Sequence, residues 1–281
     1  MKFEKWQALG NDYLILERAE LPWELSETRI EWLCDPHFGI GADGILLLAP
    51  SADPEFVADL RIFNPDGSEA ELSGNGAREA ILYLRRHGWT DAEEFAISTV
   101  AGPIRPTITG ELTCSVDMGK ASTTSKDFPS GGADGRGTVR SAGREWEFQH
   151  VSIGNPQCAI VVDPVELADL DLELIGPEIE GSTLFPNRTN VSFLAVDGSE
   201  VRARIFERGV GETLSSGTGA SGAAVTAFLR GAPSLLTVEL DGGELTVEIG
   251  EDLAVRLDGW AEPVYAGEAS AELLAALAEQ D

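Results

Sequence analysis

The sequence predicts an α+β fold of two lobes that arose by internal duplication, each rich in strands around one central helix. Three observations favour this fold. The chain has 281 residues, of which 43% are hydrophobic, which is enough for two cores of ordinary domain size. Short motifs recur in the same order in the two halves. In each half, an alternating segment typical of a strand leads through a glycine-rich turn into a helix of small residues.

The repeat has a period of about half the chain. Its matching segments are RIF at 61–63 and 204–206, Glu69 and Glu212, and SGNGA at 73–77 and SGTGA at 216–220, all at an offset of 143, with LGN at 9–11 and IGN at 153–155 at an offset of 144. Four motifs in the same order indicate duplication rather than chance.

Local signals predict the elements of each half. We expect helices over about 75–87 and 219–230, because Gly88 and Gly231 are typical of helix ends. The stretches 97–119 and 235–250 alternate like hairpins, and the second turns at Asp241-Gly242-Gly243. Gly, Ser, Pro and Asp at 125–137 predict an exposed loop. The expected divisions are an N-terminal lobe over 1–119, a C-terminal lobe over 120–262, and a C-terminal segment over 263–281 that returns to the N-terminal lobe.

Composition excludes several classes of function. The formal charge of −28, from 48 acidic and 20 basic residues, disfavours nucleic acid and anionic membranes as partners. No stretch approaches the ~20 apolar residues of a membrane span, and the N-terminal residues lack the hydrophobic region of a signal peptide. We therefore expect a cytoplasmic protein. Cys34, Cys114 and Cys158 lack metal-ligand spacing. The sequence therefore predicts neither a disulfide framework nor a metal site.

The paired SGxGA turns predict a binding site for an anion. Each begins a helix, where backbone N–H groups without an intrahelical acceptor lie at the positive end of the helix dipole. A single copy is typical of a capped helix start, but two copies at one offset favour a function. If the lobes face each other, both turns can bind one carboxylate, with Ser73 and Ser216 on opposite sides of the carbon that carries it.

Polar residues next to these turns extend the candidate site. Glu207 and Arg208 form an adjacent pair of opposite charges directly after the second RIF motif. Asn residues occupy turn-like contexts, where each alone would bond only its own backbone. These residues are Asn11, Asn64, Asn155 and Asn190. Together with the anion sites, the four could bind an ammonium group and a second carboxylate.

Nearly the whole chain resembles the diaminopimelate epimerase family. The shared motifs are LGNDYLIL, HFGIGADGILLL, RIFNPDGSEAELSGNGAR, VSIGNPQCAIVV, FPNRTNVSF, IFERGVGETLSSGTGA and GWAEPVYAGE. The resemblance implies two pseudo-symmetric lobes, each a mixed sheet wrapped around a central helix. It also implies cofactor-independent epimerisation of LL- to meso-diaminopimelate for lysine and peptidoglycan biosynthesis, and a homodimer. The implied substrate-binding residues are Asn11, Asn64, Gly74, Asn75, Asn155, Asn190, Glu207, Arg208, Gly217 and Thr218.

The chain departs from the family at the reacting groups. The family places a cysteine at the head of each SGxGA motif, where this chain has Ser73 and Ser216. A cysteine thiol ionises near ~8.5, whereas a serine hydroxyl should ionise near the ~15.7 of water. The family also has His where this chain has Gln157, and we therefore expect no activating base for Ser73.

Three functions remain open from the sequence. In the first, an amino-acid epimerase uses Ser73, Ser216, Glu207 and Gln157 as its catalytic residues. In the second, a one-base isomerase or dehydratase of the same fold uses Glu207 or Ser216. In the third, a catalytically silent relative binds an amino acid and turns nothing over. The intact substrate-binding residues favour the first hypothesis.

Overall fold

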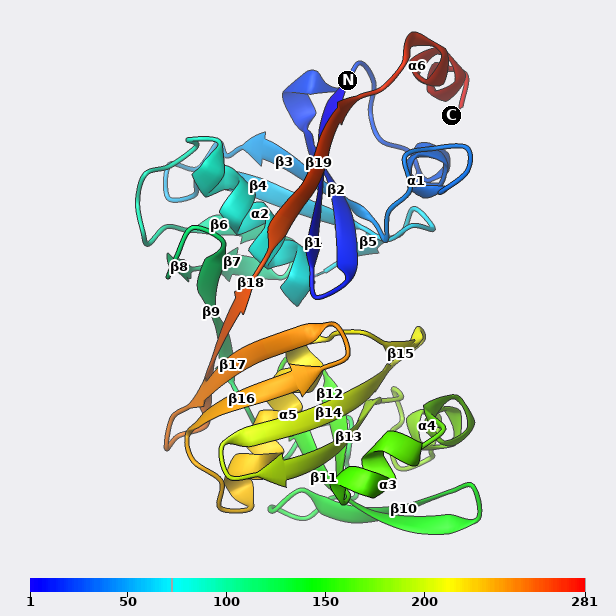
Figure 1. Ribbon diagram of the computed structural model, residues 1–281, viewed down its shortest axis with the longest axis vertical. Coiled ribbons are helices and arrows are strands. Elements are labelled where there is room, and N and C mark those ends of the chain that lie inside the picture. The colour runs from blue at the N-terminus through cyan, green and yellow to red at the C-terminus, as the bar shows by residue number, and fades with distance from the viewer. Residues whose placement is uncertain (72, 281) are drawn as a thin grey trace. The chain divides into compact units, whose positions relative to one another are not determined.

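The computed structural model describes residues 1–71 and 73–280. The chain divides into two compact units, Met1–Val116 with Trp260–Asp281, and Asp117–Gly259. Each unit contains a mixed β-sheet and one central helix (Figure 1). The two-lobed α+β fold predicted from the sequence is thereby confirmed.

The first unit surrounds helix α2 (Gly74–Arg86), which packs against strands β1, β2 and β3 (Figure 1). Its sheet has the order β19-β1-β2-β3-β4-β6-β7, with β5 beside β4. The strands are β1 (Lys2–Ala8), β2 (Asn11–Glu17), β3 (Ile45–Pro50), β4 (Ala58–Phe63), β5 (Glu69–Ala70), β6 (Ile97–Thr99), β7 (Gly102–Ile104) and β19 (Glu262–Glu268). Outside the sheet lie η1 (Arg18–Glu20), α1 (Glu27–Cys34) and α6 (Ala271–Ala278).

The second unit surrounds helix α5 (Gly217–Leu229), which packs against β11 to β14, β16 and β17. Its sheet has the order β10-β11-β12-β13-β14-β16-β17-β18-β9-β8, with β15 beside β14. The strands of this sheet are β8 (Pro106–Ile108), β9 (Thr113–Lys120), β10 (Arg136–Ser141), β11 (Arg144–Ser152), β12 (Pro156–Val161), β13 (Asn190–Asp197), β14 (Glu200–Glu207), β15 (Gly211–Thr213), β16 (Leu235–Leu240), β17 (Gly243–Ile249) and β18 (Ala254–Trp260). Of these, β8 and the first residues of β9 belong to the first unit. Helices α3 (Pro164–Asp169) and α4 (Leu172–Glu180) complete the unit.

Both central helices begin and end close to where the sequence predicts. A serine caps each one, and a glycine with positive φ follows each one, at Gly88 and Gly231. Helix α5 is built from small residues because the sheet lies very near it. A Cβ atom at Gly219 would lie 2.5 Å from Ile205 Cδ1, and one at Gly222 would lie 2.8 Å from Gln157 Cγ.

The duplication is visible in repeated ion pairs. Arg61 Nε lies 2.8 Å from Glu69 Oε1 in the first unit, and Arg204 Nε lies 2.8 Å from Glu212 Oε1 in the second. In both units the arginine lies on the long strand and the glutamate on the short strand paired with it. The ion pair therefore holds the same strand against the same turn twice, just before each central helix.

One local prediction differs from the structure. The segment 125–137 is mostly exposed, but Phe128 is buried and packs on Phe148 and Phe185 in the core of the second unit. The prediction of an exposed loop was wrong at this residue, because one aromatic side chain anchors an otherwise polar segment. The hairpins predicted over 97–119 and 235–250 are confirmed, because β6 pairs with β7, β8 pairs with β9, and β16 pairs with β17, each pair antiparallel.

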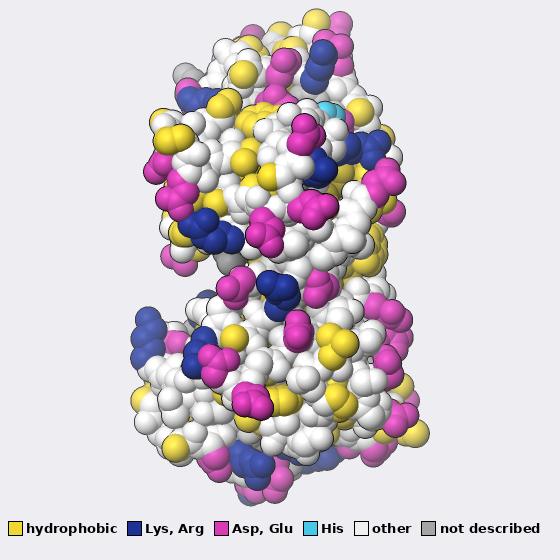
Figure 2. Space-filling view, turned by 90° about the vertical axis from the view of Figure 1, so that its left-hand side faces the viewer, with side chains coloured by type: hydrophobic (Ala, Val, Ile, Leu, Met, Phe, Trp, Pro, Cys, Tyr) yellow, Lys and Arg dark blue, Asp and Glu magenta, His cyan; other side chains and the backbone are white. Residues whose placement is uncertain are grey.

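The surface reflects the acidic composition. Figure 2 shows acidic side chains spread over the face in view of each unit, with fewer basic ones among them. In the part of the chain that the structure describes, no helix is long and apolar enough to cross a lipid bilayer.

Candidate active site

In the first unit, Ser73 lies at the N-terminal cap of α2. Its Oγ accepts a hydrogen bond from the Gly76 N–H at 3.1 Å, which is a standard way to satisfy a first-turn donor. The hydroxyl of Tyr13, on β2, donates a second hydrogen bond to the same Oγ at 3.1 Å. Ser73 therefore has two donors directed at its oxygen, and its own proton is available to a third group.

In the second unit, Ser216 occupies the equivalent cap of α5. Its Oγ accepts from the Gly219 N–H at 3.2 Å, and only 4% of the residue is exposed. The carboxylate of Glu207, the last residue of β14, lies beside this hydroxyl and accepts from Thr213 Oγ1 at 3.0 Å. Burial raises the pKa of Glu207 above its ordinary value, and the Thr213 and Ser216 side chains offset part of that rise.

Each helix start holds an amide contact in the same place. Asn75 Nδ2 donates to Asn11 Oδ1 at 3.2 Å in the first unit, and Asn155 Nδ2 donates to Thr218 Oγ1 at 3.1 Å in the second. Asn11 matches Asn155 in the repeat, and Asn75 matches Thr218. Each LGN or IGN turn is thereby fixed beside the first turn of its central helix, where the Gly74 and Gly217 N–H groups have no acceptor within the helix.

A buried arginine orients the first of these contacts. Arg78 donates to the Gly74 carbonyl at 3.0 Å and to Asn75 Oδ1 at 2.6 Å. The residue is completely buried, and burial lowers the pKa of its guanidinium. Because Oδ1 of Asn75 accepts from Arg78, its Nδ2 is directed to Asn11, which fixes the orientation of that amide.

Gln157 plays the corresponding part in the second unit. Its side chain is fully buried against Gly222, and its Nε2 donates to Asn155 Oδ1 at 2.7 Å. Among the described residues, its Oε1 accepts no hydrogen bond. Gln157 therefore holds the amide of Asn155 toward Thr218, a positioning contact.

The remaining predicted residues lie in two turns. Asn190, the first residue of β13, accepts from the Arg208 N–H at 2.7 Å, and the Arg208 side chain donates to the Asn187 carbonyl at 3.0 Å. The structure thus brings Asn190, Glu207 and Arg208 together in the second unit. In the first unit, Asn64 donates to Ser68 Oγ at 2.9 Å, within its own turn.

Two residues of the first unit were missed by the sequence reasoning. Tyr13, whose hydroxyl donates to Ser73 Oγ, matches Gln157 when the LGN and IGN motifs are extended by two residues. Because Tyr13 is a donor in this contact and not a base, the expectation that Ser73 has no activating base stays a prediction. Glu79 is also completely buried, and the Tyr13 backbone beside it offsets only part of the effect of that burial on its carboxyl group. Burial raises the pKa of Glu79 well above its ordinary value.

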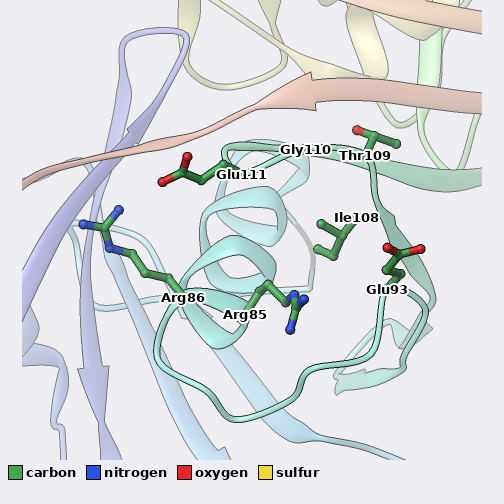
Figure 3. A pocket seen from close by; sticks show the side chains of 7 residues that line it. All are labelled: Arg85, Arg86, Glu93, Ile108, Thr109, Gly110 and Glu111. Carbon is green, nitrogen blue, oxygen red and sulfur yellow. The ribbon is translucent and has the colours of Figure 1, made fainter.

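Other features of the described residues lie apart from these serines. A surface groove of about 520 Å³ in the first unit is lined by seven residues, from the end of α2, the segment after it, and the end of β8 with the turn that follows (Figure 3). They are Arg85, Arg86, Glu93, Ile108, Thr109, Gly110 and Glu111, none of which is a predicted site residue. The described residues contain no group of three or more His, Cys, Asp or Glu side chains arranged to hold a metal ion, and the three cysteines are buried free thiols.

Comparison with known proteins gives consistent matches over the chain. A family model described as diaminopimelate epimerase matches residues 3–124 and 149–262. Diaminopimelate epimerase 2 of Nostoc sp. strain PCC 7120 is 40% identical over 284 residues, with 98% of each chain covered. The diaminopimelate epimerase of Pelotomaculum thermopropionicum is 38% identical over 280 residues, covering 95% of this chain and 98% of the relative. A solved structure of a probable proline racemase from Agrobacterium radiobacter K84 has a TM-score of 0.69 at 14% identity, covering 96% and 93% of the two chains, which shows a shared fold.

Proposed function

The chain belongs to the diaminopimelate epimerase family, and from this premise we propose that it inverts an α-carbon of diaminopimelate, converting the LL isomer to the meso isomer. One observation carries the proposal. Each unit presents a serine at the start of its central helix, beside N–H groups suited to a carboxylate. Inversion at carbon needs one group that removes a proton and another that delivers one, and the duplicated units supply two such serines.

The proposed substrate contacts divide into two sets. The carboxylate on the reacting carbon accepts hydrogen bonds from N–H groups in the first turn of a central helix, which withdraw charge from the carbanion formed there. These groups belong to Gly74, Asn75, Gly217 and Thr218. The distal amino-acid end is bound by amides and by the charged pair after β14. Those residues are Asn11, Asn64, Asn155, Asn190, Glu207 and Arg208.

Ser216 is the proposed base on its side of the carbon. A lone serine is a poor base because its hydroxyl ionises near ~15.7, as water does. The contact with Glu207 changes this, because the Ser216 proton can move to the carboxylate while Oγ takes the proton from Cα. The Cα–H electron pair stays on carbon as the carbanion. A raised pKa brings Glu207 closer to neutral pH, where a general base works best.

The direct test is chromatographic separation of the isomers after incubation of LL-diaminopimelate with the purified chain. Accumulation of the meso isomer by the parent, and its loss in Ser216→Ala, supports the proposal. Calorimetric binding of diaminopimelate without any product would contradict it and would indicate a relative that only binds the amino acid.

One observation also favours the one-base alternative. The carboxylate Glu207 contacts Ser216, whereas its repeat equivalent in the first unit is Asn64. A one-base isomerase or dehydratase would lose turnover in Glu207→Gln but keep it in Ser73→Ala. Loss in both variants supports epimerisation through two groups.

The proposal also covers the setting of the enzyme. Family membership places it in lysine biosynthesis. A cytoplasmic location, a homodimer and a reaction that requires no added cofactor belong to the same proposal. Light scattering coupled to size-exclusion chromatography tests the dimer, which a mass near 29.9 kDa would contradict.

A further inference from the structure

The two serines differ in the side chains that lie beside them. Ser73 Oγ accepts from both the Tyr13 hydroxyl and the Gly76 N–H, each at 3.1 Å. Ser216 accepts from its helix N–H and has the Glu207 carboxylate beside it, a group that can only accept a proton when ionised. The contacts therefore suit Ser73 to donate a proton to the carbon, because Tyr13 can replace that proton. They suit Ser216 to accept a proton from the carbon, because Glu207 can take the proton of its hydroxyl.

We infer that Tyr13 is the proton-relay residue of Ser73, so that Tyr13 with Ser73 forms an acid arm and Glu207 with Ser216 forms a base arm. This inference rests on the proposed epimerase function. It assigns to each serine a direction of proton transfer, toward the carbon at Ser73 and away from the carbon at Ser216. Tyr13 acts through Ser73, which places it among the positioning residues of the site.

The fold fixes the tyrosine ring in place. Tyr13 is buried on β2, and the backbone of Gly44 lies against its ring, because a Cβ atom there would be 2.7 Å from Tyr13 Cε1. Its repeat equivalent in the second unit, Gln157, donates to Asn155 instead. The difference between the arms is thus built into one repeat position, which carries a phenol in the first unit and an amide in the second.

The proton transfers balance along the two arms. In one direction, the Cα proton moves to Ser216 Oγ as the Ser216 proton moves to Glu207. The Ser73 proton moves to the carbanion as the Tyr13 proton moves to Ser73 Oγ. The products of one turnover are a protonated Glu207 and a Tyr13 phenolate, and exchange with water restores both.

A phenol makes this relay easier than a lone serine would. A tyrosine ionises near ~10, whereas a serine hydroxyl ionises near ~15.7. Moving the charge from Ser73 Oγ to the Tyr13 ring therefore replaces the alkoxide with a much weaker base. The reverse reaction runs the same transfers backwards, with the phenolate as the group that ultimately takes the proton.

The contact can be tested without relying on turnover. In Ser73→Cys, the rate of alkylation by iodoacetamide as a function of pH reports the pKa of the introduced thiol, because the three natural cysteines are buried. Adding Tyr13→Phe removes one donor to the thiolate and should raise that pKa by about one unit, roughly tenfold less thiolate at a given pH below it. Tyr83→Phe is the matched control, since the Tyr83 hydroxyl donates to Glu17 instead. An unchanged pKa on adding Tyr13→Phe would overturn the inference.

Turnover then tests the relay itself. Tyr13→Phe should lower kcat about a hundredfold or more in the serine enzyme. It should lower kcat much less in the Ser73→Cys background, where the thiol ionises without the phenol. An equal loss in both backgrounds would overturn the inference. Absence of conversion by the parent would contradict the proposed function, and the alkylation experiment would still decide whether Tyr13 stabilises charge at position 73.

Discussion

The Ser216 side chain lies beside the Glu207 carboxylate. The pair lies where β14 ends and α5 begins, and the matching position in the first unit holds Asn64 rather than a carboxylate. The duplication therefore repeated the scaffold but not the acid–base groups. Two serines at equivalent caps acquire different properties from the side chains that neighbouring strands bring to them.

Replacing Glu207 should remove the base arm. Glu207→Gln keeps the shape of the side chain and cannot take the Ser216 proton, so kcat should fall by about 10² to 10⁴. The matched control is Glu200→Gln, an exposed glutamate at the other end of β14, which should keep full activity. Stopped-time assays of isomer conversion measure both, and equal activity in the two variants would contradict the base role.

The pH dependence of kcat/KM should report the same carboxylate. Activity requires ionised Glu207, so kcat/KM should fall as the pH is lowered through the Glu207 pKa. Burial raises that pKa, so the acid limb should lie above the ordinary glutamate value of 4.5. The residual activity of Glu207→Gln should not show this fall of kcat/KM at low pH. A fall at the same pH in that variant would show that another group titrates there.

The amide contact at α5 should matter for binding more than for chemistry. Thr218→Val removes the acceptor of the Asn155 hydrogen bond at nearly constant volume. A loss of about 1 kcal/mol corresponds to a rise in KM of roughly fivefold, with little change in kcat. Thr226→Val, which removes a buried hydroxyl bonded to the Gly222 carbonyl on the same helix, is the control. Similar KM values for the two variants would argue against a role for Asn155 in binding.

Glu79 should make the chain less stable as the pH rises. The pKa of Glu79 is raised in the folded state. Its contribution to the free energy of unfolding is therefore fully present below the pKa of the unfolded state and is lost as the pH rises toward the pKa of the folded state. Glu79→Gln should therefore unfold with a higher free energy than the parent at pH 8, by at least about 1 kcal/mol, since each unit by which the folded-state pKa is raised corresponds to about 1.36 kcal/mol. Urea unfolding at pH 5 and pH 8 measures this, with the exposed Glu93→Gln as control. A difference that does not grow with pH would contradict the assignment.

Local sequence signals were sufficient to predict the two central helices and the main hairpin. The helix starts at Ser73 and Ser216 and the ends at Gly88 and Gly231 follow from caps and positive-φ glycines, which depend on a few neighbouring residues. The hairpin at Asp241 was equally local. The exact repeat at RIF and SGxGA placed the units because a duplicated sequence folds twice in the same way.

The features that sequence reasoning missed depend on distant contacts. Tyr13 meets Ser73 across 60 residues of chain, and no pattern near either residue specifies that contact. Phe128 lies in a polar segment but joins an aromatic cluster formed by β11 and a later loop. Both depend on which strands become neighbours. Extending the LGN and IGN repeat to Tyr13 and Gln157 would have marked the first of them.

Loss of the α-proton to deuterated water tests the central claim most directly. Proton NMR of the purified chain with LL-diaminopimelate should show the Cα–H signal disappearing at the rate of conversion to the meso isomer, and both should be lost in Ser216→Ala. The Ser73→Cys, Ser216→Cys double variant should also exchange the proton, which controls for an intact substrate site. A parent that leaves the signal unchanged while the double variant exchanges it would contradict the claim that the two serine arms carry out the inversion.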